Sequence, residues 1–441
     1  MYELQTWKAG LVVVVWSVIC STVPLVAEDW PHWRGPNRND IVAESSGWTA
    51  KGWIENRPSW KAKVGEGSSS PIVVGERLFT MGWRDQQDSV YCLNAATGKE
   101  IWSVSYECPQ YGRVATGDEG LYSGPTSTPE YDKATGFLYT LSCDGDLNCW
   151  DTNQRGSRVW GINLFEEYSV GRRPRVGRSG LRDYGYTTAP LIYGDWVIVE
   201  VGAAAGTLVA FSKTTGKQTW LSEAQGPAGH TGGLVPMTVE GVPCVATMTF
   251  RGLLVARVDS ANAGKTVAEY EWITDFINNI ATPAVFENQV VITSAYNHFA
   301  ICKLEITLGG ARKLWEQSYA SKACSPVIHK GHVYWAWQQL HCLDFATGKQ
   351  KWEGGNFGDP GSCIATADDR LIVWGGRGKL ALVETAQRSP PKYHEVASIE
   401  RVFATDAWPH VTLANGHLHC KDRDGNLACF EVPRSDEVSA Q

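Results

Sequence analysis

An arginine-rich stretch is the segment of this sequence whose residue types most clearly suggest binding chemistry. Five arginines occur between positions 172 and 182. A guanidinium group presents planar donors that suit carboxylate or phosphate oxygens, so the stretch favours an anionic ligand or an acidic partner. The alternative is a solvated loop. The predicted binding residues of this region are Arg172, Arg173, Arg175, Arg178, Arg182, Tyr184, Tyr186 and His230.

Cysteine is a second residue type with available chemistry, and twelve are present. There is no Cys-x-x-Cys pair and no closely spaced set of Cys and His, so the spacing predicts no zinc site. Five cysteines recur at one position of an internal repeat, where Ala210, Ala256 or Leu382 stands in other copies. A position that accepts Cys, Ala or Leu is an apolar packing position. We therefore expect buried free thiols at Cys92, Cys149, Cys302, Cys342 and Cys429.

Six other cysteines lie beyond the N-terminal leader: Cys108, Cys143, Cys244, Cys324, Cys363 and Cys420. An oxidising compartment would permit disulfides among them, but the sequence leaves their pairing open. The acidic stretch 422–426 resembles the start of a calcium loop and lacks the distal Glu of such loops. We interpret it, like the stretch 144–146, as a hairpin turn and predict no metal.

Composition limits the classes of function. The chain has 441 residues and a formal charge of −7, with 43% hydrophobic and 20% charged residues, which is typical of a folded globular protein. The mild acidity, spread along the chain, removes the electrostatic basis for general nucleic-acid binding. With 45 Gly, 20 Trp and only 4 Met, the composition favours short strands and turns over helices.

The first 27 residues predict a secretory signal peptide. An apolar run of about residues 11–23 precedes a polar composition that begins at Glu28. The run is too short to span a bilayer comfortably, and the pattern favours cleavage after Ala27. An uncleaved N-terminal anchor is the alternative. Since no later stretch is long and apolar enough to span a membrane, we expect a periplasmic or secreted protein, and a monomer.

Internal repeats predict the fold. The fragment Thr-Gly-Lys-x-x-Trp occurs at 97–102, 215–220 and 347–352, each time after an alternating apolar strand. Glycine adopts the positive φ of a tight hairpin, which places the Trp on the outgoing strand. With the weaker copies we count eight units of four antiparallel strands. The repeat residues are Trp60, Trp102, Trp160, Trp220, Trp272, Trp315 and Trp352, with Gly98, Gly216 and Gly348.

The repeats predict an all-β, eight-bladed β-propeller over residues 59–432, after a lead-in of residues 28–58 and before a disordered tail of residues 433–441. The last unit lacks a fourth strand, and the strand at Trp60 has no unit of its own. We therefore expect Trp60 to complete the blade of Phe430 and close the ring. Small and polar residues open the innermost strands and should surround the central channel, as a ligand cup or a water-filled axis.

The Thr-Gly-Lys-x-x-Trp units resemble the tryptophan-docking repeats of the pyrroloquinoline-quinone-type, or quinoprotein-like, propellers. That family includes quinoprotein dehydrogenases and the propeller subunit of the outer-membrane barrel-assembly machine. The resemblance covers residues 59–432 and implies the propeller fold. A dehydrogenase of this family would need pyrroloquinoline quinone (PQQ) with calcium, and commonly a disulfide between adjacent cysteines, a pair this sequence lacks.

We therefore predict a non-enzymatic scaffold that holds an envelope protein partner, similar to the propeller subunit of the assembly machine, with no cofactor and no catalytic residue. One alternative is a quinone-dependent alcohol or sugar dehydrogenase that uses PQQ and calcium. Another is a binding module for anionic polysaccharide at the arginine-rich stretch.

Overall fold

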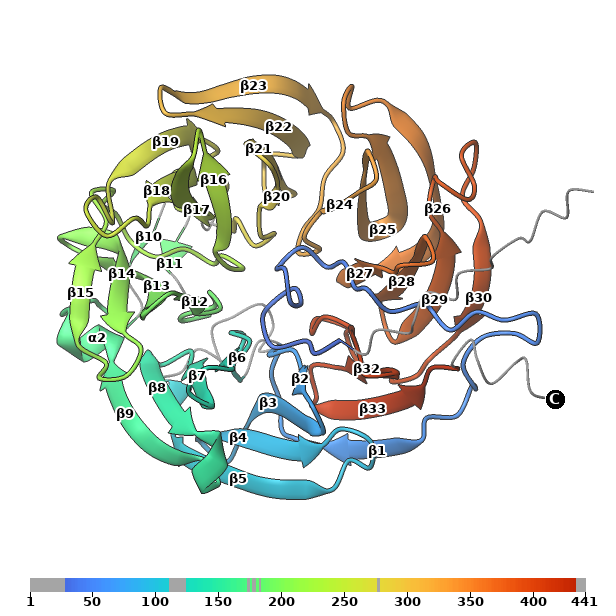
Figure 1. The fold of residues 1–441 in the computed structure, drawn as a ribbon, viewed down its shortest axis with the longest axis horizontal. Coiled ribbons are helices and arrows are strands. Elements are labelled where there is room, and N and C mark those ends of the chain that lie inside the picture. Colours follow the sequence, from blue (N-terminus) through green and yellow to red (C-terminus); the bar gives the residue numbers. More distant parts are fainter. Residues whose placement is uncertain are drawn as a thin grey trace, which may run out of the picture.

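Eight antiparallel sheets stand around a central axis like the blades of a propeller (Figure 1), which confirms the predicted fold. This computed structural model describes residues 28–110, 124–172, 175–176, 180–181, 184–275 and 278–433, with only the backbone described at 175–176 and 180–181. Within seven of these sheets the strands run in sequence order from the axis outward and successive strands are joined by hairpins, whereas in the eighth the outer strand comes from the N-terminal part of the chain. Helix is rare in this part of the chain, and the two elements that lie wholly within it are the short η3 (Thr152–Gln154) and α2 (Leu164–Glu167).

The first four blades are built from consecutive hairpins. Their strands are β2 (Ile72–Val74), β3 (Arg77–Arg84), β4 (Gln87–Asn94) and β5 (Glu100–Glu107); β6 (Glu130–Asp132), β7 (Phe137–Leu141), β8 (Asp146–Asp151) and β9 (Ser157–Asn163); β12 (Leu191–Tyr193), β13 (Trp196–Ala203), β14 (Gly206–Ser212) and β15 (Gln218–Leu221); and β16 (Val235–Val239), β17 (Val242–Thr249), β18 (Gly252–Arg257) and β19 (Thr266–Glu271). A two-residue ladder, β10 (Arg175–Val176) with β11 (Gly180–Leu181), lies between the second and third blades.

The next three blades follow the same plan. Their strands are β20 (Ala284–Phe286), β21 (Gln289–Ser294), β22 (Ala300–Thr307) and β23 (Gly310–Gln317); β24 (Val327–His329), β25 (His332–Asp344) and β26 (Gln350–Gly358); and β27 (Gly361–Ala365), β28 (Arg370–Gly375), β29 (Lys379–Glu384) and β30 (Glu395–Ile399). In the sixth blade β25 supplies the second and third strands together. Its Tyr334 pairs with β24 and its Cys342 pairs with β26, and Gln338 between them has a φ of 59°.

The eighth blade joins the two ends of the propeller. It contains β31 (Thr412–Ala414), β32 (His417–Lys421), β33 (Asn426–Glu431) and, as its outer strand, β1 (Trp60–Lys63). Trp60 lies opposite Cys429, beside Phe430, as the sequence predicted. Pairing of the first strand with the last removes the exposed edges that an open ring would leave, so this ladder holds the whole ring closed.

Tryptophans on the outer strands lock neighbouring blades together. Each of five indoles packs on a positive-φ glycine in the turn before the outer strand of the next blade, where a Cβ would lie 2.5–3.2 Å from the ring. The pairs are Trp60 with Gly98, Trp102 with Gly156, Trp160 with Gly216, Trp220 with Gly264, and Trp315 with Gly348. Three of these indoles, those of Trp60, Trp160 and Trp315, also donate to a carbonyl of the same turn, at 3.0–3.1 Å.

The fourth blade departs from the repeat that we predicted. In five other blades the repeat Trp lies on the outer strand next to a β-bulge. In the fourth blade Ala268, opposite Val255, has that position, and Trp272 lies beyond the end of β19. Trp272 still contacts the next blade, because its indole donates to Ser294 Oγ at 2.9 Å and stacks on His298 with a centroid distance of 3.8 Å. The prediction was wrong in position because it followed the next Trp along the chain, whereas Gly264-Lys265-x-x-Ala268 corresponds to the Gly-Lys-x-x-Trp of the other units and has Ala in place of Trp.

The predicted cysteine position also needs two corrections. Cys92, Cys149, Cys342 and Cys429 each lie opposite an outer-strand Trp, but in the fifth blade Lys303 pairs with Trp315 and Cys302 is one residue away. In the fourth blade the position belongs to Val255, not Ala256. All eleven cysteines of the described part of the chain are buried free thiols, which confirms the prediction for the five repeat cysteines.

The lead-in crosses the middle of the ring (Figure 1, dark blue) and contacts blades far apart in sequence. Trp30 pairs with Val73 of β2, and Val42 donates to the carbonyl of Ala365 at the end of β27. Arg34, 1% exposed, donates to the carbonyl of Pro326 at 2.6 Å. The lead-in is therefore part of the folded core.

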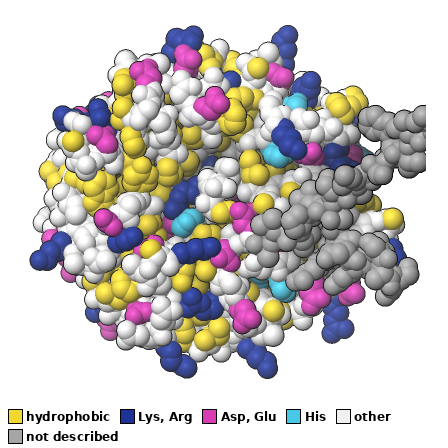
Figure 2. Space-filling view, viewed as in Figure 1, with side chains coloured by type: hydrophobic (Ala, Val, Ile, Leu, Met, Phe, Trp, Pro, Cys, Tyr) yellow, Lys and Arg dark blue, Asp and Glu magenta, His cyan; other side chains and the backbone are white. Residues whose placement is uncertain are grey.

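On the face that carries the lead-in, Figure 2 shows acidic and basic side chains interspersed around the ring.

Candidate functional site

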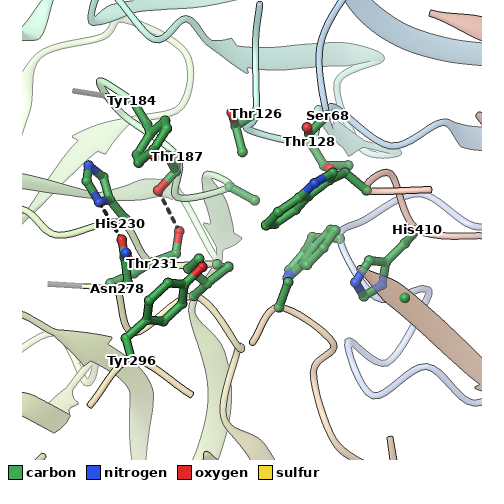
Figure 3. Close-up of a pocket in the computed structure, with 17 residues that line it drawn as sticks. Ser68, Thr126, Thr128, Tyr184, Thr187, His230, Thr231, Asn278, Tyr296 and His410 are labelled. Carbon is green, nitrogen blue, oxygen red and sulfur yellow. Dashed lines mark hydrogen bonds between the residues drawn. The ribbon is translucent and has the colours of Figure 1, made fainter. Parts of the chain in front are cut away.

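A pocket of about 90 Å³ lies at the mouth of the central channel (Figure 3). Its lining comes mainly from residues just before the inner strands of successive blades, as the sequence predicted for the channel ring. These residues include Ser68, Thr126, Thr187, His230, Thr231, Asn278 and His410. All inner strands begin at the same end of the channel, and the pocket lies at that end. The lead-in pairs with the middle or the opposite end of these strands, so the pocket opens on the face opposite to the lead-in.

Trp33 of the lead-in forms the floor of this pocket. Its indole nitrogen donates to Thr282 Oγ1 at 2.9 Å, and its ring lies 4.2 Å from the His410 ring. A Cβ at Gly233 would lie 2.8 Å from the Trp33 ring, so that glycine makes room for the indole. The channel is therefore closed just below the pocket, which keeps the pocket shallow.

His230 and Asn278 form one wall of the pocket. His230 Nδ1 lies 2.7 Å from Asn278 Oδ1, and the Tyr184 ring meets the His230 ring edge-on with a centroid distance of 4.6 Å. The close-up shows Tyr184 and Tyr296 extending toward the pocket from different blades (Figure 3). Because these side chains are held by contacts with one another, this wall is preorganised for a ligand.

A buried carboxylate fixes the backbone beneath this wall. Glu200 of β13 is fully buried and accepts hydrogen bonds from Thr188 Oγ1, Thr231 Oγ1 and the amide of Gly229. Thr187 adds a hydrogen bond of 2.9 Å to the carbonyl of Thr231. The third and fourth blades therefore present their pocket residues as one rigid unit.

Two buried ion pairs anchor the lead-in below the pocket. Arg38 donates to both carboxylate oxygens of Glu130, His32 lies 2.8 Å from the same group, and Arg34 pairs with Asp40. Burial alone would raise the pKa of Glu130, but Arg38 and His32 hold it below its ordinary value. Burial opposes ionisation of Asp40 too, and Arg34 and His410 lower its pKa.

The predicted arginine site is only partly described. Arg172 pairs with Glu166 at 2.8 Å and lies over the Phe165 ring, while the side chains of Arg173, Arg175, Arg178 and Arg182 lie outside the described residues. The backbones of Arg175 and Leu181 pair, which makes the stretch a hairpin.

Of the other predicted binding residues, Tyr184 and His230 line the pocket, and Tyr186 does not. Tyr186 is 1% exposed, packs 4.7 Å from the Phe165 ring and donates to the carbonyl of Val201 at 2.8 Å. In this position Tyr186 packs in the core beneath the pocket face and supports the fold.

Sequence reasoning missed three aromatic residues of the pocket: Trp33, Tyr296 and Trp408. None of them lies on a strand: Trp33 belongs to the lead-in, Tyr296 to the turn between β21 and β22, and Trp408 to the connector before β31. Their position off the repeated strands is the feature of the sequence that could have identified them. The sequence prediction used that feature only for the long connectors.

The described lining does not fit the quinone and calcium of the predicted alternative. Calcium takes six to eight oxygen ligands, usually with carboxylates among them. The lining residues that the structure describes include Ser, Thr, Asn, His, Tyr and Trp but no Asp or Glu. We therefore assign no step of chemistry to such a cofactor here. Among the described residues, no helix is long and apolar enough to cross a membrane.

Eight blades, with tryptophan-on-glycine contacts at five of the junctions between them, define the class: a propeller of pyrroloquinoline-quinone-type repeats. Residues 86–354 match the family model described as outer membrane protein assembly factor BamB, and the chain belongs to this family. A curated relative, the outer membrane protein assembly factor BamB of Nitrosomonas eutropha, is 24% identical over 299 residues. That match covers 63% of this chain and spans only 58% of the relative's length.

Two solved structures share the fold. BamB from Moraxella catarrhalis superposes with a TM-score of 0.58 at 14% identity, covering 85% of this chain and 99% of that one. Quinohemoprotein alcohol dehydrogenase from Comamonas testosteroni gives a TM-score of 0.64 at 13% identity, covering 92% of this chain and 80% of that one. At such identities the likeness concerns the fold alone, since one fold hosts both binding proteins and enzymes.

Proposed function

We propose that this protein is a non-enzymatic scaffold of the periplasm or cell surface that binds an envelope protein partner through the face that carries the pocket. Membership of the BamB family is the observation that carries the proposal. The relative from Nitrosomonas eutropha is named as an assembly factor for outer membrane proteins, a role that depends on contact with other envelope proteins.

The pocket supports a protein partner because of its size and chemistry. A volume of about 90 Å³ suits a single side chain better than a large cofactor. Aromatic rings from Tyr184, Tyr296 and Trp408 border it, and hydroxyl and amide groups lie between them. Protein interfaces commonly place one anchor side chain in such a preorganised pocket.

The arginine-rich stretch that contains β10 and β11 would extend the proposed surface. It leads directly to Tyr184 on the pocket wall, so one partner can contact both features. The side chains of this hairpin would add electrostatic attraction to an acidic partner, which added salt would weaken.

Site-specific photo-crosslinking in cells of the source organism tests the proposal. A photoreactive residue at Tyr296, on the pocket rim, should give a discrete crosslinked species that mass spectrometry identifies as an envelope protein. Phe286 is the matched control, because it is 49% exposed, belongs to the same blade and lies at the far end of β20. Equal crosslinking from both positions, or none from Tyr296, would overturn the proposed surface.

A dye-reduction assay tests the absence of enzyme activity. The purified protein is mixed with PQQ, calcium and a panel of alcohols and sugars. No turnover is expected, because the described pocket lining offers calcium no carboxylate. Turnover that depends on added quinone would replace the scaffold with the dehydrogenase.

A further inference from the structure

Three side chains that could bind a metal meet between the first and second blades. Cys108 follows β5, and Cys143 and Asp144 lie in the turn between β7 and β8. All three are buried, with exposed fractions of 0%, 3% and 2%. Their ligand atoms lie within 4.8 Å of one another. Because Cys108 lies 35 positions before Cys143 and belongs to the neighbouring blade, the fold brings it to the Cys143-Asp144 turn.

The distances match tetrahedral zinc. The two sulfurs are 3.8 Å apart, and Cys108 Sγ is 3.5 Å from Asp144 Oδ2. A tetrahedral zinc ion with Zn–S of about 2.3 Å and Zn–O of about 2.0 Å separates two sulfurs by about 3.8 Å and a sulfur from an oxygen by about 3.5 Å. A disulfide needs about 2.05 Å between the sulfurs, so the observed separation fits a shared metal more closely.

The surrounding contacts hold these groups in place. The amide of Gln110 donates to Asp144 Oδ2 at 2.7 Å, and the indole of Trp83 donates to the carbonyl of Cys108 at 2.8 Å. Gly145 has a φ of 90°, and a Cβ there would lie 2.8 Å from the Phe165 ring. Such supporting contacts orient the ligands of metal sites.

A second carboxylate adjoins the cluster. Asp88 of β4 is fully buried and interacts with the Cys108 thiol. The hydrogen bond with Cys143, burial and the nearby Asp88 all raise the pKa of Cys108, since each of them opposes a second negative charge. A bound cation would reverse this preference and favour the thiolate.

We propose that Cys108, Cys143 and Asp144 bind a zinc ion, with a water molecule as the fourth ligand. Binding replaces two S–H bonds with two S–Zn bonds and releases two protons to solvent, with no change of oxidation state. The ion joins the end of the first blade to the hairpin turn of the second, beside the connector that leads toward the pocket face. The site is independent of the proposed scaffold function.

Metal analysis of the full-length protein, purified without chelators, tests this site. Elemental analysis should find about one zinc per chain. Cys108→Ser and Cys143→Ser should each reduce the zinc content at least tenfold. Cys244→Ser is the matched control, because Cys244 is equally buried, donates to the carbonyl of Val242 and lies in the fourth blade. Its zinc content should equal that of the wild type.

Cobalt substitution keeps the test valid if a serine variant fails to fold. Apoprotein prepared from the wild type with a chelator should take up Co²⁺ and develop thiolate-to-cobalt charge-transfer absorption, and added zinc should abolish it. Two results would overturn the proposal. One is a metal-free protein that shows no such absorption. The other is a protein whose intact mass is lower by two hydrogens and whose Cys108 and Cys143 are linked, which would identify a disulfide.

Discussion

Trp60 and Gly98 meet across the junction where the two ends of the propeller join. Trp60 lies on β1, the outer strand of the eighth blade, and Gly98 lies in the turn between β4 and β5 of the first. A Cβ on Gly98 would lie only 2.5 Å from Trp60 Cε3, and the Trp60 indole donates to the carbonyl of Ala95 in the same turn. Ring closure therefore depends on Gly98 in two ways: it adopts the positive φ of the turn, and its missing side chain leaves room for the Trp60 indole.

Gly98→Ala should destabilise the protein by roughly 2–4 kcal/mol, since it combines a left-handed backbone cost of about 1–2 kcal/mol with overpacking against the indole. Gly331→Ala separates the two effects. Gly331 has a similar positive φ, but a Cβ there would contact nothing within 4 Å. Urea unfolding should show a loss at Gly98 that exceeds the loss at Gly331 by at least 1 kcal/mol. Equal losses would mean that the indole does not confine Gly98.

Trp102→Ala and Trp352→Ala should each cost roughly 3–5 kcal/mol, the range for truncation of a large buried side chain. Trp102 and Trp352 are 4% and 5% exposed, and each contacts the next blade, Trp102 at Gly156 and Trp352 at Tyr393. Ile101→Ala, next to Trp102 but 38% exposed, is the control and should change stability by less than 1 kcal/mol. If either Trp variant lost less than about 1 kcal/mol of unfolding free energy, its indole would not be needed to hold neighbouring blades together.

The sequence predicted the propeller because its repeat has a local cause. A glycine turn followed by a Trp is encoded within six residues, as at 97–102, and the missing outer strand of the last blade identified Trp60 as its completion. Errors arose where a blade departs from the repeat. In the fifth blade Lys303, not Cys302, lies opposite Trp315, a shift of one residue that the alternation of side chains does not reveal. In the fourth blade Ala268 lies opposite Val255, and Trp272 comes four residues later.

The site was less predictable because non-local contacts build it. Arg34 reaches Pro326 across 292 positions, and Trp33 reaches Thr282 across 249. Local patterning gives no information about such pairs, so the lead-in was assigned no role in the channel. His230 was identified among the residues that precede the inner strands, a position that the repeat itself defines, and Tyr184 was identified because it follows the arginine-rich stretch of a long connector.

Acid should loosen the lead-in before it unfolds the propeller. The ordinary pKa values of Glu130 and Asp40 are 4.5 and 3.8, and both are lowered in the folded protein. A carboxylate with a lowered folded pKa contributes stability that is complete above its unfolded pKa and is lost as the pH falls through the folded value. The unfolding free energy should therefore decline below about pH 4.5, as equilibrium urea melts at several pH values would show.

The variant Glu130→Gln measures how much the Glu130 carboxylate contributes to stability and to its dependence on pH. At pH 7 the variant leaves Arg38 buried without its charge partner and should lose roughly 3–5 kcal/mol. Its stability should then fall less steeply with acid than that of the wild type. Lys133→Gln is the control, because the Lys133–Asp29 pair is more exposed and should contribute less than about 1 kcal/mol. A Glu130→Gln variant with an unchanged acid slope would contradict the assignment.

Trp33→Ala should convert the pocket floor into a cavity that indole can refill. The side chain fills the channel between His410 and Gly233, and its N–H donates to Thr282 Oγ1. Because Trp33 is only half-buried, we expect a loss of roughly 2–3 kcal/mol, somewhat less than for a core Trp. Free indole at about ten times its Kd should restore about 1.4 kcal/mol through mass action.

Two comparisons make that rescue specific. Indole should leave the melting temperature of the wild type unchanged, because the site is already filled by Trp33. Benzothiophene has a similar shape but no N–H, so it should rescue the variant more weakly, since the buried Thr282 hydroxyl would lose its donor. Equal stabilisation of wild type and variant by indole would place its binding elsewhere, and equal rescue by both compounds would show that the hydrogen bond to Thr282 contributes nothing to seating the indole.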